Sequence, residues 1–243
     1  MKIIIIIPAR FNSSRFPGKP LIKLLGKPMI QWVAELSSKV VTKKNVYVAT
    51  ENRKIFNTIS NLGYKSIMTS KNCLTGTDRL AEVAKKINAD IYINVQGDEP
   101  LIKPKDIKKI INAKIKYPND IINGFTIVEK HEDVKSLNLP KVVFSKDKRL
   151  LYISRQTLPG YKEIKKKPDI YYKQVCIYAF NRQELLLYGK CKKKGKIESS
   201  EDIEIIRYLD LNKTIRMVQT SQGSLAVDEP KDVKKVEKAL KKI

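Results

Sequence analysis

Basic and hydroxyl side chains follow the apolar run at the start of the chain. Residues 8–21 read Pro-Ala-Arg-Phe-Asn-Ser-Ser-Arg-Phe-Pro-Gly-Lys-Pro-Leu. Arginine can grip phosphate oxygens in bidentate fashion, lysine adds a compact charge, and backbone amides add further donors. The stretch matches neither a Walker P-loop nor the glycine pattern of dinucleotide-binding folds. It therefore predicts a polyphosphate-binding loop rather than an ordinary basic turn, with the polar members Arg10, Ser13, Ser14, Arg15 and Lys19.

An acidic pair follows a second apolar run. Asp98 and Glu99 lie in the segment Asn-Val-Gln-Gly-Asp-Glu-Pro, residues 94–100. Carboxylates on a tight turn at the carboxyl end of a parallel strand can present the hard oxygen ligands that Mg²⁺ prefers. A solvated turn is the alternative interpretation. The basic loop expected on a neighbouring strand favours the metal.

Two shorter segments have a local explanation and a functional one. Residues 75–80 read Thr-Gly-Thr-Asp-Arg-Leu, and residues 227–232 read Val-Asp-Glu-Pro-Lys-Asp. Taken alone, each is first interpreted as the start of a helix, with Thr77 or Asp78 capping one and Asp228 capping the other. A metal role for Asp228 requires it to face the acidic pair, which spacing does not show.

The elements that would position these loops alternate between strand and helix up to residue 118. Apolar, β-branched runs predict strands, and helical spacing of apolar residues predicts helices. The expected strands are 3–7, 46–49, 66–68 and 91–95, and the expected helices are about 28–40, 52–62, 77–88 and 104–117. Such alternation predicts a mostly parallel sheet covered on both faces. Ligands then bind beyond the carboxyl ends of the strands, where loops 8–20 and 96–100 fall.

The pattern changes after residue 120. Strands are expected at 121–128, 142–144, 150–154, 172–180 and 214–219, with a helix over about 199–209 and a last helix from Pro230. Internal repeats and a low-complexity linker are both lacking in the sequence. We therefore predict an α/β fold in one domain that contains a β-rich insertion, rather than two independent domains.

Composition limits the classes of function. The 243 residues carry a net charge of +24, from 49 basic and 25 acidic side chains, which raises nucleic acid as a partner. The lysines are spread along helix-like surfaces without interleaved aromatic residues, so attraction for anionic small substrates is favoured. Three cysteines without paired spacing argue against a disulfide framework or a zinc site. No apolar run approaches the roughly 20 residues of a membrane span, and no signal-peptide cleavage site follows residues 3–7, which predicts a cytoplasmic protein.

Four motifs, in this order, resemble those of the CMP-Kdo synthetases, the 3-deoxy-manno-octulosonate cytidylyltransferase family. They are P-A-R-x-x-S-x-R-x-P-G-K-P-L, T-G-T-D-R, Q-G-D-E-P-L-I and V-D-x-P-x-D, and the resemblance runs from Ile3 to about residue 240. It implies a Rossmann-like nucleotidyltransferase, usually a homodimer, that uses Mg²⁺. The implied reaction couples a 3-deoxy-2-ulosonic acid, Kdo above all, with CTP to give the CMP-sugar and pyrophosphate.

The resemblance also implies roles for particular residues. The catalytic group is Arg10, Lys19, Asp98 and Asp228, of which Asp98 and Asp228 hold the metal. The nucleotide-binding group is Pro8, Ala9, Arg10, Ser13, Ser14, Arg15, Lys19, Thr77, Asp78, Arg79 and Gln96. The sugar-acid group is Arg155, Gln174, Tyr178, Glu204 and Arg207. The nucleotide-binding part spans about 1–120 and 220–243, and the sugar-acid-binding and dimerisation part about 121–219.

The expected chemistry is an in-line attack of the anomeric hydroxyl on the α-phosphate of CTP, from which pyrophosphate leaves. Lys19 and the loop arginines would offset the charge on the leaving group. Two residues depart from the family pattern, because Gln174 stands where a histidine is common and Ile205 where a glutamine is common. Both lie on the acceptor side, which leaves open a different acid such as a nonulosonate. A sugar-phosphate acceptor and a basic nucleic-acid-binding protein are the remaining alternatives.

Overall fold

A mixed sheet forms the centre of the molecule. The computed structural model describes residues 1–12, 16–223 and 225–242. Its strands run in the order β11-β7-β10-β6-β1-β4-β5, with β8 added beside β10 and β9 beside β8. Their bounds are β1 Ile3–Ala9, β4 Val46–Thr50, β5 Lys65–Met68, β6 Ile91–Val95, β7 Ile121–Ile127, β8 Lys141–Phe144, β9 Leu150–Ser154, β10 Tyr172–Phe180 and β11 Ile215–Gln219. A separate small hairpin joins β2 (Lys23–Leu24) to β3 (Lys27–Pro28).

Strand β1 shows why the opening isoleucine run is continuous. Ile4 and Ile6 pack into the core on one face of the sheet, and Ile5 and Ile7 pack into the core on the other. Successive side chains of a strand point to opposite faces, so a strand buried on both sides needs apolar residues at every position. Strands β4, β1 and β6 are parallel neighbours, whereas β10 is antiparallel to both β6 and β7. The predicted α/β fold with a mostly parallel sheet is confirmed.

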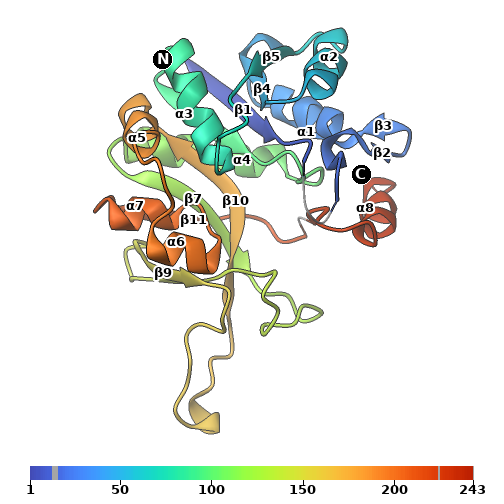
Figure 1. Ribbon diagram of the computed structural model, residues 1–243. Helices are drawn as coiled ribbons and strands as arrows, with labels where there is room; N and C mark the ends of the chain where they lie inside the picture. The colour runs from blue at the N-terminus through green and yellow to red at the C-terminus, as the bar shows by residue number, and fades with distance from the viewer. Residues whose placement is uncertain (13–15, 224, 243) are drawn as a thin grey trace.

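Helices cover both faces of the sheet (Figure 1). Residues of α1 (Met29–Ser38), α2 (Arg53–Asn61) and α4 (Pro104–Lys116) share one core cluster. Residues of α3 (Gly76–Lys86), α5 (Arg182–Tyr188) and α7 (Ile206–Asp210) share the other. The remaining helices are α6 Lys196–Glu201, α8 Asp232–Leu240 and the short 3-10 turns η1 Lys19–Leu21, η2 Lys43–Asn45 and η3 Ile164–Lys166. Within the described ranges, no helix has the length and apolarity to cross a membrane.

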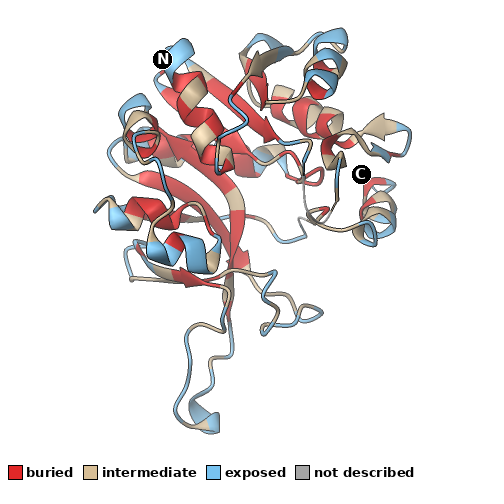
Figure 2. Ribbon diagram, viewed as in Figure 1, coloured by how far each residue is buried: buried red, intermediate tan, exposed pale blue. Residues whose placement is uncertain are grey.

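The β-rich insertion extends the sheet past its parallel half. Strands β8 and β9 pair as an antiparallel hairpin against β10. The chain between β9 and β10 projects from the body as a long arm (Figure 1) and is mostly exposed or half-buried (Figure 2). Both parts of the chain contribute strands to the same sheet, in line with one domain. The finer division into nucleotide-binding and sugar-acid-binding parts stays a prediction.

Three features of the helices differ from the expectation. The helix expected over 199–209 is broken into α6 and α7, because Asp202 adopts a left-handed conformation with φ 49° and ends α6. Helix α5 was not predicted, although Asn181 and Glu184 form a capping box before a leucine run. The last helix begins at Asp232 rather than at Pro230.

Candidate active site

The acidic turn after β6 lies directly against the end of β1. The two strands are parallel neighbours, so their carboxyl ends meet at one edge of the sheet. Gly97 makes the close approach possible, because a Cβ there would lie 3.0 Å from the carbonyl oxygen of Pro8 and 3.0 Å from a side-chain carbon of Ile30. A larger residue would push the turn away from β1. The glycine thus places Asp98 beside the basic loop.

The basic loop brings its lysine to this acidic turn. Gly18 has a φ of 70°, which favours glycine, and its N–H donates to the carbonyl of Phe11 at 2.8 Å. Turn η1 starts at the next residue, Lys19, whose Nζ donates to Asp98 Oδ2 at 2.6 Å. The same ammonium lies 3.7 Å from Asp228 Oδ1. Three residues far apart in sequence therefore converge on one point.

Asp228 does not cap the last helix. The N-cap residue of that helix is Lys231, whose side chain makes no capping hydrogen bond. The carboxylate of Asp232 instead accepts from the backbone N–H groups of Asp228 at 2.9 Å and Glu229 at 2.8 Å, in the turn before the helix. The preceding residue, Val227, donates its N–H to the carbonyl oxygen of Asp98 at 3.0 Å. This backbone contact ties the late segment to the acidic turn. The condition that the sequence left open, that Asp228 should face Asp98, is met.

A polar pocket of about 180 Å³ opens above these three residues. Its walls include residues of the loop after β1, of the turn after β6 and of the start of α3. The lining residues are Pro8, Ala9, Arg10, Lys19, Pro20, Met29, Gly76, Gln96, Gly97, Asp98 and Asp228. We call it the nucleotide pocket. The predicted loop residues Ser13, Ser14 and Arg15 lie outside the described part of the chain.

The donor set suits a magnesium ion. Mg²⁺ is usually bound by one or two carboxylates, and substrate phosphates and water complete its octahedral shell. Asp98 and Asp228 offer two carboxylates that converge on a single cation, Lys19, at the wall of the nucleotide pocket. Among the described residues, no group of three or more His, Cys, Asp or Glu side chains could hold a metal ion, so substrate phosphates and water would have to supply the other ligands. The arrangement fits a metal that arrives with a polyphosphate.

A second pocket of about 340 Å³ adjoins the first and shares Arg10, Gly76 and Gln96 with it. We call it the acceptor pocket. Strand β10 and the segment before α7 form much of its wall. Four residues predicted to bind the sugar acid line it: Arg155, Gln174, Tyr178 and Glu204. That these residues bind a ligand stays a prediction, but the structure brings them together.

Glu204 connects the two pockets. Its carboxylate accepts from the backbone N–H of Thr77 at 2.9 Å and from the Gln96 side-chain amide at 3.0 Å. Burial raises the pKa of Glu204, although the hydrogen bond from Thr77 partly opposes the shift. Gln96 lines both pockets. A carboxylate of the acceptor pocket therefore holds an amide that reaches the nucleotide pocket.

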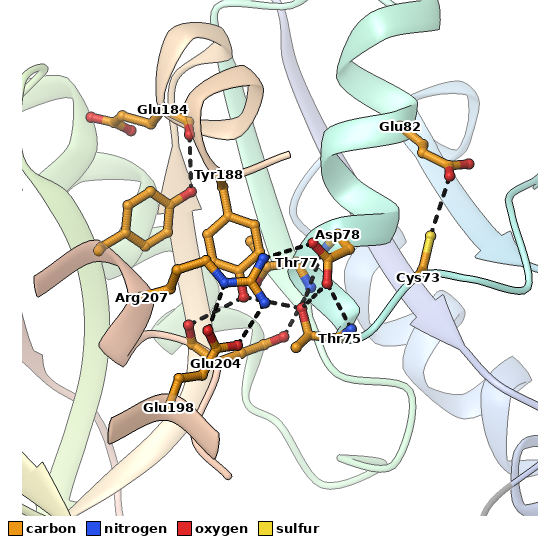
Figure 3. A network of polar contacts seen from close by, with 11 residues as sticks. Cys73, Thr75, Thr77, Asp78, Glu82, Glu184, Tyr188, Glu198, Glu204 and Arg207 are labelled. Atoms are coloured by element: carbon orange, nitrogen blue, oxygen red, sulfur yellow. Dashed lines mark hydrogen bonds and ion pairs between the residues drawn. The ribbon is translucent and has the colours of Figure 1, made fainter. Parts of the chain in front are cut away.

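Several residues predicted to bind the substrates belong to a buried network of polar contacts behind the acceptor pocket (Figure 3). Thr75, rather than Thr77, caps α3, and Asp78 completes the capping box. Arg207 donates to Asp78 at 2.9 Å and to both carboxylate oxygens of Glu198, at 2.7 and 2.6 Å. Its guanidinium carbon also lies 3.9 Å from the centre of the Tyr188 ring. Burial opposes the charge on Arg207, yet the hydrogen bonds to Glu198 and Asp78 leave its pKa raised.

Four predicted ligand-binding residues line neither pocket. Arg207 is 2% exposed and held by its carboxylate partners, so the structure places it in the interior and not at the wall of the acceptor pocket. Arg79 is likewise buried and pairs with Glu51 at 2.7 Å. Thr77 is buried and Asp78 is held by the helix cap and Arg207. Arg79, Asp78 and Arg207 support the site from behind, because these ion pairs already engage their charged groups.

The two departures from the family pattern have different surroundings. Gln174 lines the acceptor pocket, and its amide donates to Asn123 at 3.0 Å and to the Tyr178 hydroxyl at 3.3 Å. Ile205 is 1% exposed and packs in the core beneath α7. Ile205 does not line the acceptor pocket, so the structure gives no support to the expectation that it faces the sugar. Ile203, two residues earlier, lines the pocket, although it too is buried and belongs to the same core cluster.

The fold and the site together define a nucleotidyltransferase. The sequence pattern of the family described as "Cytidylyltransferase" matches residues 4–221, and the chain belongs to this family. It is 40% identical to the 3-deoxy-manno-octulosonate cytidylyltransferase of Trichlorobacter lovleyi, over 99% of both chains. It is 35% identical to the 8-amino-3,8-dideoxy-manno-octulosonate cytidylyltransferase of Shewanella oneidensis, again over 99% of both chains. A solved structure of CMP:2-keto-3-deoxy-manno-octonic acid synthetase with CTP superposes with a TM-score of 0.91, at 35% identity, over 100% of this chain and 99% of that chain.

Proposed function

We propose that this enzyme transfers CMP from CTP to a 3-deoxy-2-ulosonic acid, with Kdo as the principal acceptor. The observation that carries the proposal is the convergence of Lys19, Asp98 and Asp228 at a pocket that opens into a second one. The first pocket suits a triphosphate and its metal, and the second offers cations and hydrogen-bonding groups for an acidic polyol. The names of the relatives support the same pair of substrates.

In the proposed reaction, the anomeric hydroxyl of the acid attacks the α-phosphate in line. The new oxygen–phosphorus bond forms as the bond to pyrophosphate breaks, and the hydroxyl proton passes to solvent. Lys19 and Arg10 line the nucleotide pocket, where their charges would stabilise the leaving pyrophosphate. Positioning of the two substrates supplies much of the remaining rate enhancement.

Asp98 and Asp228 would hold Mg²⁺ in this proposal. When bound, the ion would neutralise phosphate charge and make the acceptor hydroxyl easier to deprotonate. The ammonium of Lys19 lies where the two carboxylates meet. The lysine therefore keeps the two carboxylates close together, and we expect it to turn toward the phosphates when the substrate binds.

A second acceptor deserves a direct test because the relatives divide between two names. The chain is 35–40% identical both to enzymes named for Kdo and to enzymes named for its 8-amino analogue.

We further propose a cytoplasmic homodimer with the division into a nucleotide part and a sugar-acid part given above. Ile164 and Ile170 of the projecting arm are exposed, which supports a dimer interface at the arm. Light scattering measures whether the enzyme is a dimer.

The test is pyrophosphate release with CTP and Mg²⁺ across a panel of acceptors. The panel contains Kdo, its 8-amino analogue, a nine-carbon ulosonic acid and a sugar phosphate, and mass spectrometry identifies the CMP-sugar. We expect release with an eight-carbon acid and none with the sugar phosphate. Release with the sugar phosphate alone, or steeply salt-dependent duplex binding without release, would contradict the proposal.

A further inference from the structure

The acceptor pocket holds a cation that the motifs do not include. Lys194 lies in the loop before α6 and lines the pocket together with Arg10 and Arg155. Two acidic residues, Asp202 and Glu204, line the same walls. An acidic sugar brings one carboxylate into this space, so the question is which cation receives it.

Arg155 is largely committed to the protein backbone. Its Nε donates to the carbonyl of Glu201 at 2.5 Å, its Nη1 to that of Leu137 at 2.8 Å, and its Nη2 to that of Asp202 at 3.0 Å. A guanidinium has five N–H donors, so these contacts leave two. In addition, the buried ammonium of Lys141 donates to the carbonyl oxygen of Arg155. Arg155 is therefore rigidly placed, with only part of its donor capacity available to a substrate.

Lys194 has the opposite character. Its Nζ pairs with Asp202 Oδ1 at 2.5 Å, and the Asp202 side chain is 72% exposed. An ion pair with so exposed a partner contributes little to stability, so a carboxylate of a substrate can replace Asp202 at small cost. Lys194 itself is 26% exposed and already faces the pocket.

The charges around Asp202 show that the cations of the pocket act on a common point. The hydrogen bond from Lys194 lowers the pKa of Asp202, and the charges of Arg155 and Arg10 lower it further. A carboxylate at this position is thus stabilised by three cations from three different segments. Asp202 also accepts from Arg155 through its backbone carbonyl, so it anchors both neighbouring cations.

We propose that Lys194 binds the carboxylate of the acidic sugar, and that Asp202 occupies that position until the substrate replaces it. The inference rests on the proposed function. It adds a specificity-determining residue from outside the four motifs, and it explains why a pocket for an anion contains an exposed acidic side chain.

The test compares steady-state kinetics of three variants with those of the wild type, using CTP and Kdo. Lys194→Ala should raise the KM for Kdo about tenfold or more, as expected for a lost charge-assisted hydrogen bond, with the KM for CTP unchanged. Lys193→Ala is the matched control, because Lys193 is an exposed neighbour in the same loop that does not line the pocket, and it should behave as wild type. Asp202→Asn should lower the KM for Kdo, since asparagine tolerates the left-handed backbone and the substrate carboxylate no longer has to displace an anionic partner from Lys194.

The KM for Kdo should rise in Lys194→Ala and fall in Asp202→Asn, and this difference separates a role in binding from a structural role. If Lys194 and Asp202 only held the loop together, both variants would raise KM alike, and that result would overturn the inference. An unchanged KM for Kdo in Lys194→Ala would overturn it as well, while wild-type release of pyrophosphate left the proposed function standing. Failure of the wild type to use any acid would overturn both. Thermal unfolding of each variant shows that the kinetics compare folded proteins.

Discussion

The nucleotide pocket and the network behind the acceptor pocket use charged residues in opposite ways. In the pocket, Lys19 is 13% exposed while its partners Asp98 and Asp228 are 29% and 37% exposed. In the network, Arg207 is 2% exposed and its partner Glu198 is fully buried. An accessible ion pair can exchange partners with a charged ligand, whereas a buried pair cannot open without leaving a charge uncompensated. Burial, rather than charge type, therefore decides which cations can act on substrates.

The largest expected effect is on the buried network. Arg207→Ala should lower the free energy of unfolding by about 3–5 kcal/mol, because Glu198 would remain buried without its partner. Urea denaturation measures the change, and Lys213→Ala, an exposed lysine close by in sequence, serves as the control. A normal unfolding midpoint together with a raised KM for the sugar acid would place Arg207 at the ligand and break the comparison.

The next effect concerns the paired carboxylates of the pocket. Asp98→Asn and Asp228→Asn should each lower kcat by on the order of 10²–10³-fold, the range seen when one transition-state contact is lost. Both side chains are partly exposed, so the unfolding midpoint should change little. Activity is measured across a magnesium titration. Near-normal turnover of Asp228→Asn at limiting Mg²⁺ would reduce that residue to a structural role.

A smaller effect is expected from the lysine between these carboxylates. Lys19→Ala should lower kcat and raise the KM for CTP by roughly 10–100-fold, as for a lost charge-assisted contact, with little change in the KM for the sugar acid. Lys23→Ala removes an exposed lysine from the same stretch and should be neutral. A loss confined to sugar affinity would contradict the assignment of Lys19 to the triphosphate.

The smallest effect is a change in pH dependence. Burial raises the pKa of Glu204 above its usual value of 4.5, so the group takes up a proton at a higher pH than an ordinary carboxyl. Protonation removes an acceptor for Thr77 and Gln96, so kcat/KM for the sugar acid should fall as the pH drops through that raised pKa. Glu204→Gln should lose this acid limb and retain partial activity at neutral pH. If kcat/KM of the variant fell at low pH in the same way as that of the wild type, the fall would belong to another titrating group.

Much of the nucleotide side could be predicted because its signals are local. The isoleucine run of β1, the loop that ends at Lys19 and the turn at Asp98 each follow from a few adjacent residues. Helix α5 was missed even though its capping box is equally local. The broken helix at 199–209 depends on one backbone conformation, that of Asp202, which residue type alone does not specify.

The sequence by itself determined the fold class and the places of the loops at the carboxyl ends of β1 and β6. These follow from apolar periodicity, which operates over one element and the turn after it. Only the tertiary structure decided which distant side chains meet: Asp228 faces Lys19, while Arg207 turns inward to Glu198. It also decided that Ile205 packs in the core. Such pairings depend on how elements pack over long stretches of chain, and spacing within a motif carries no information about that packing.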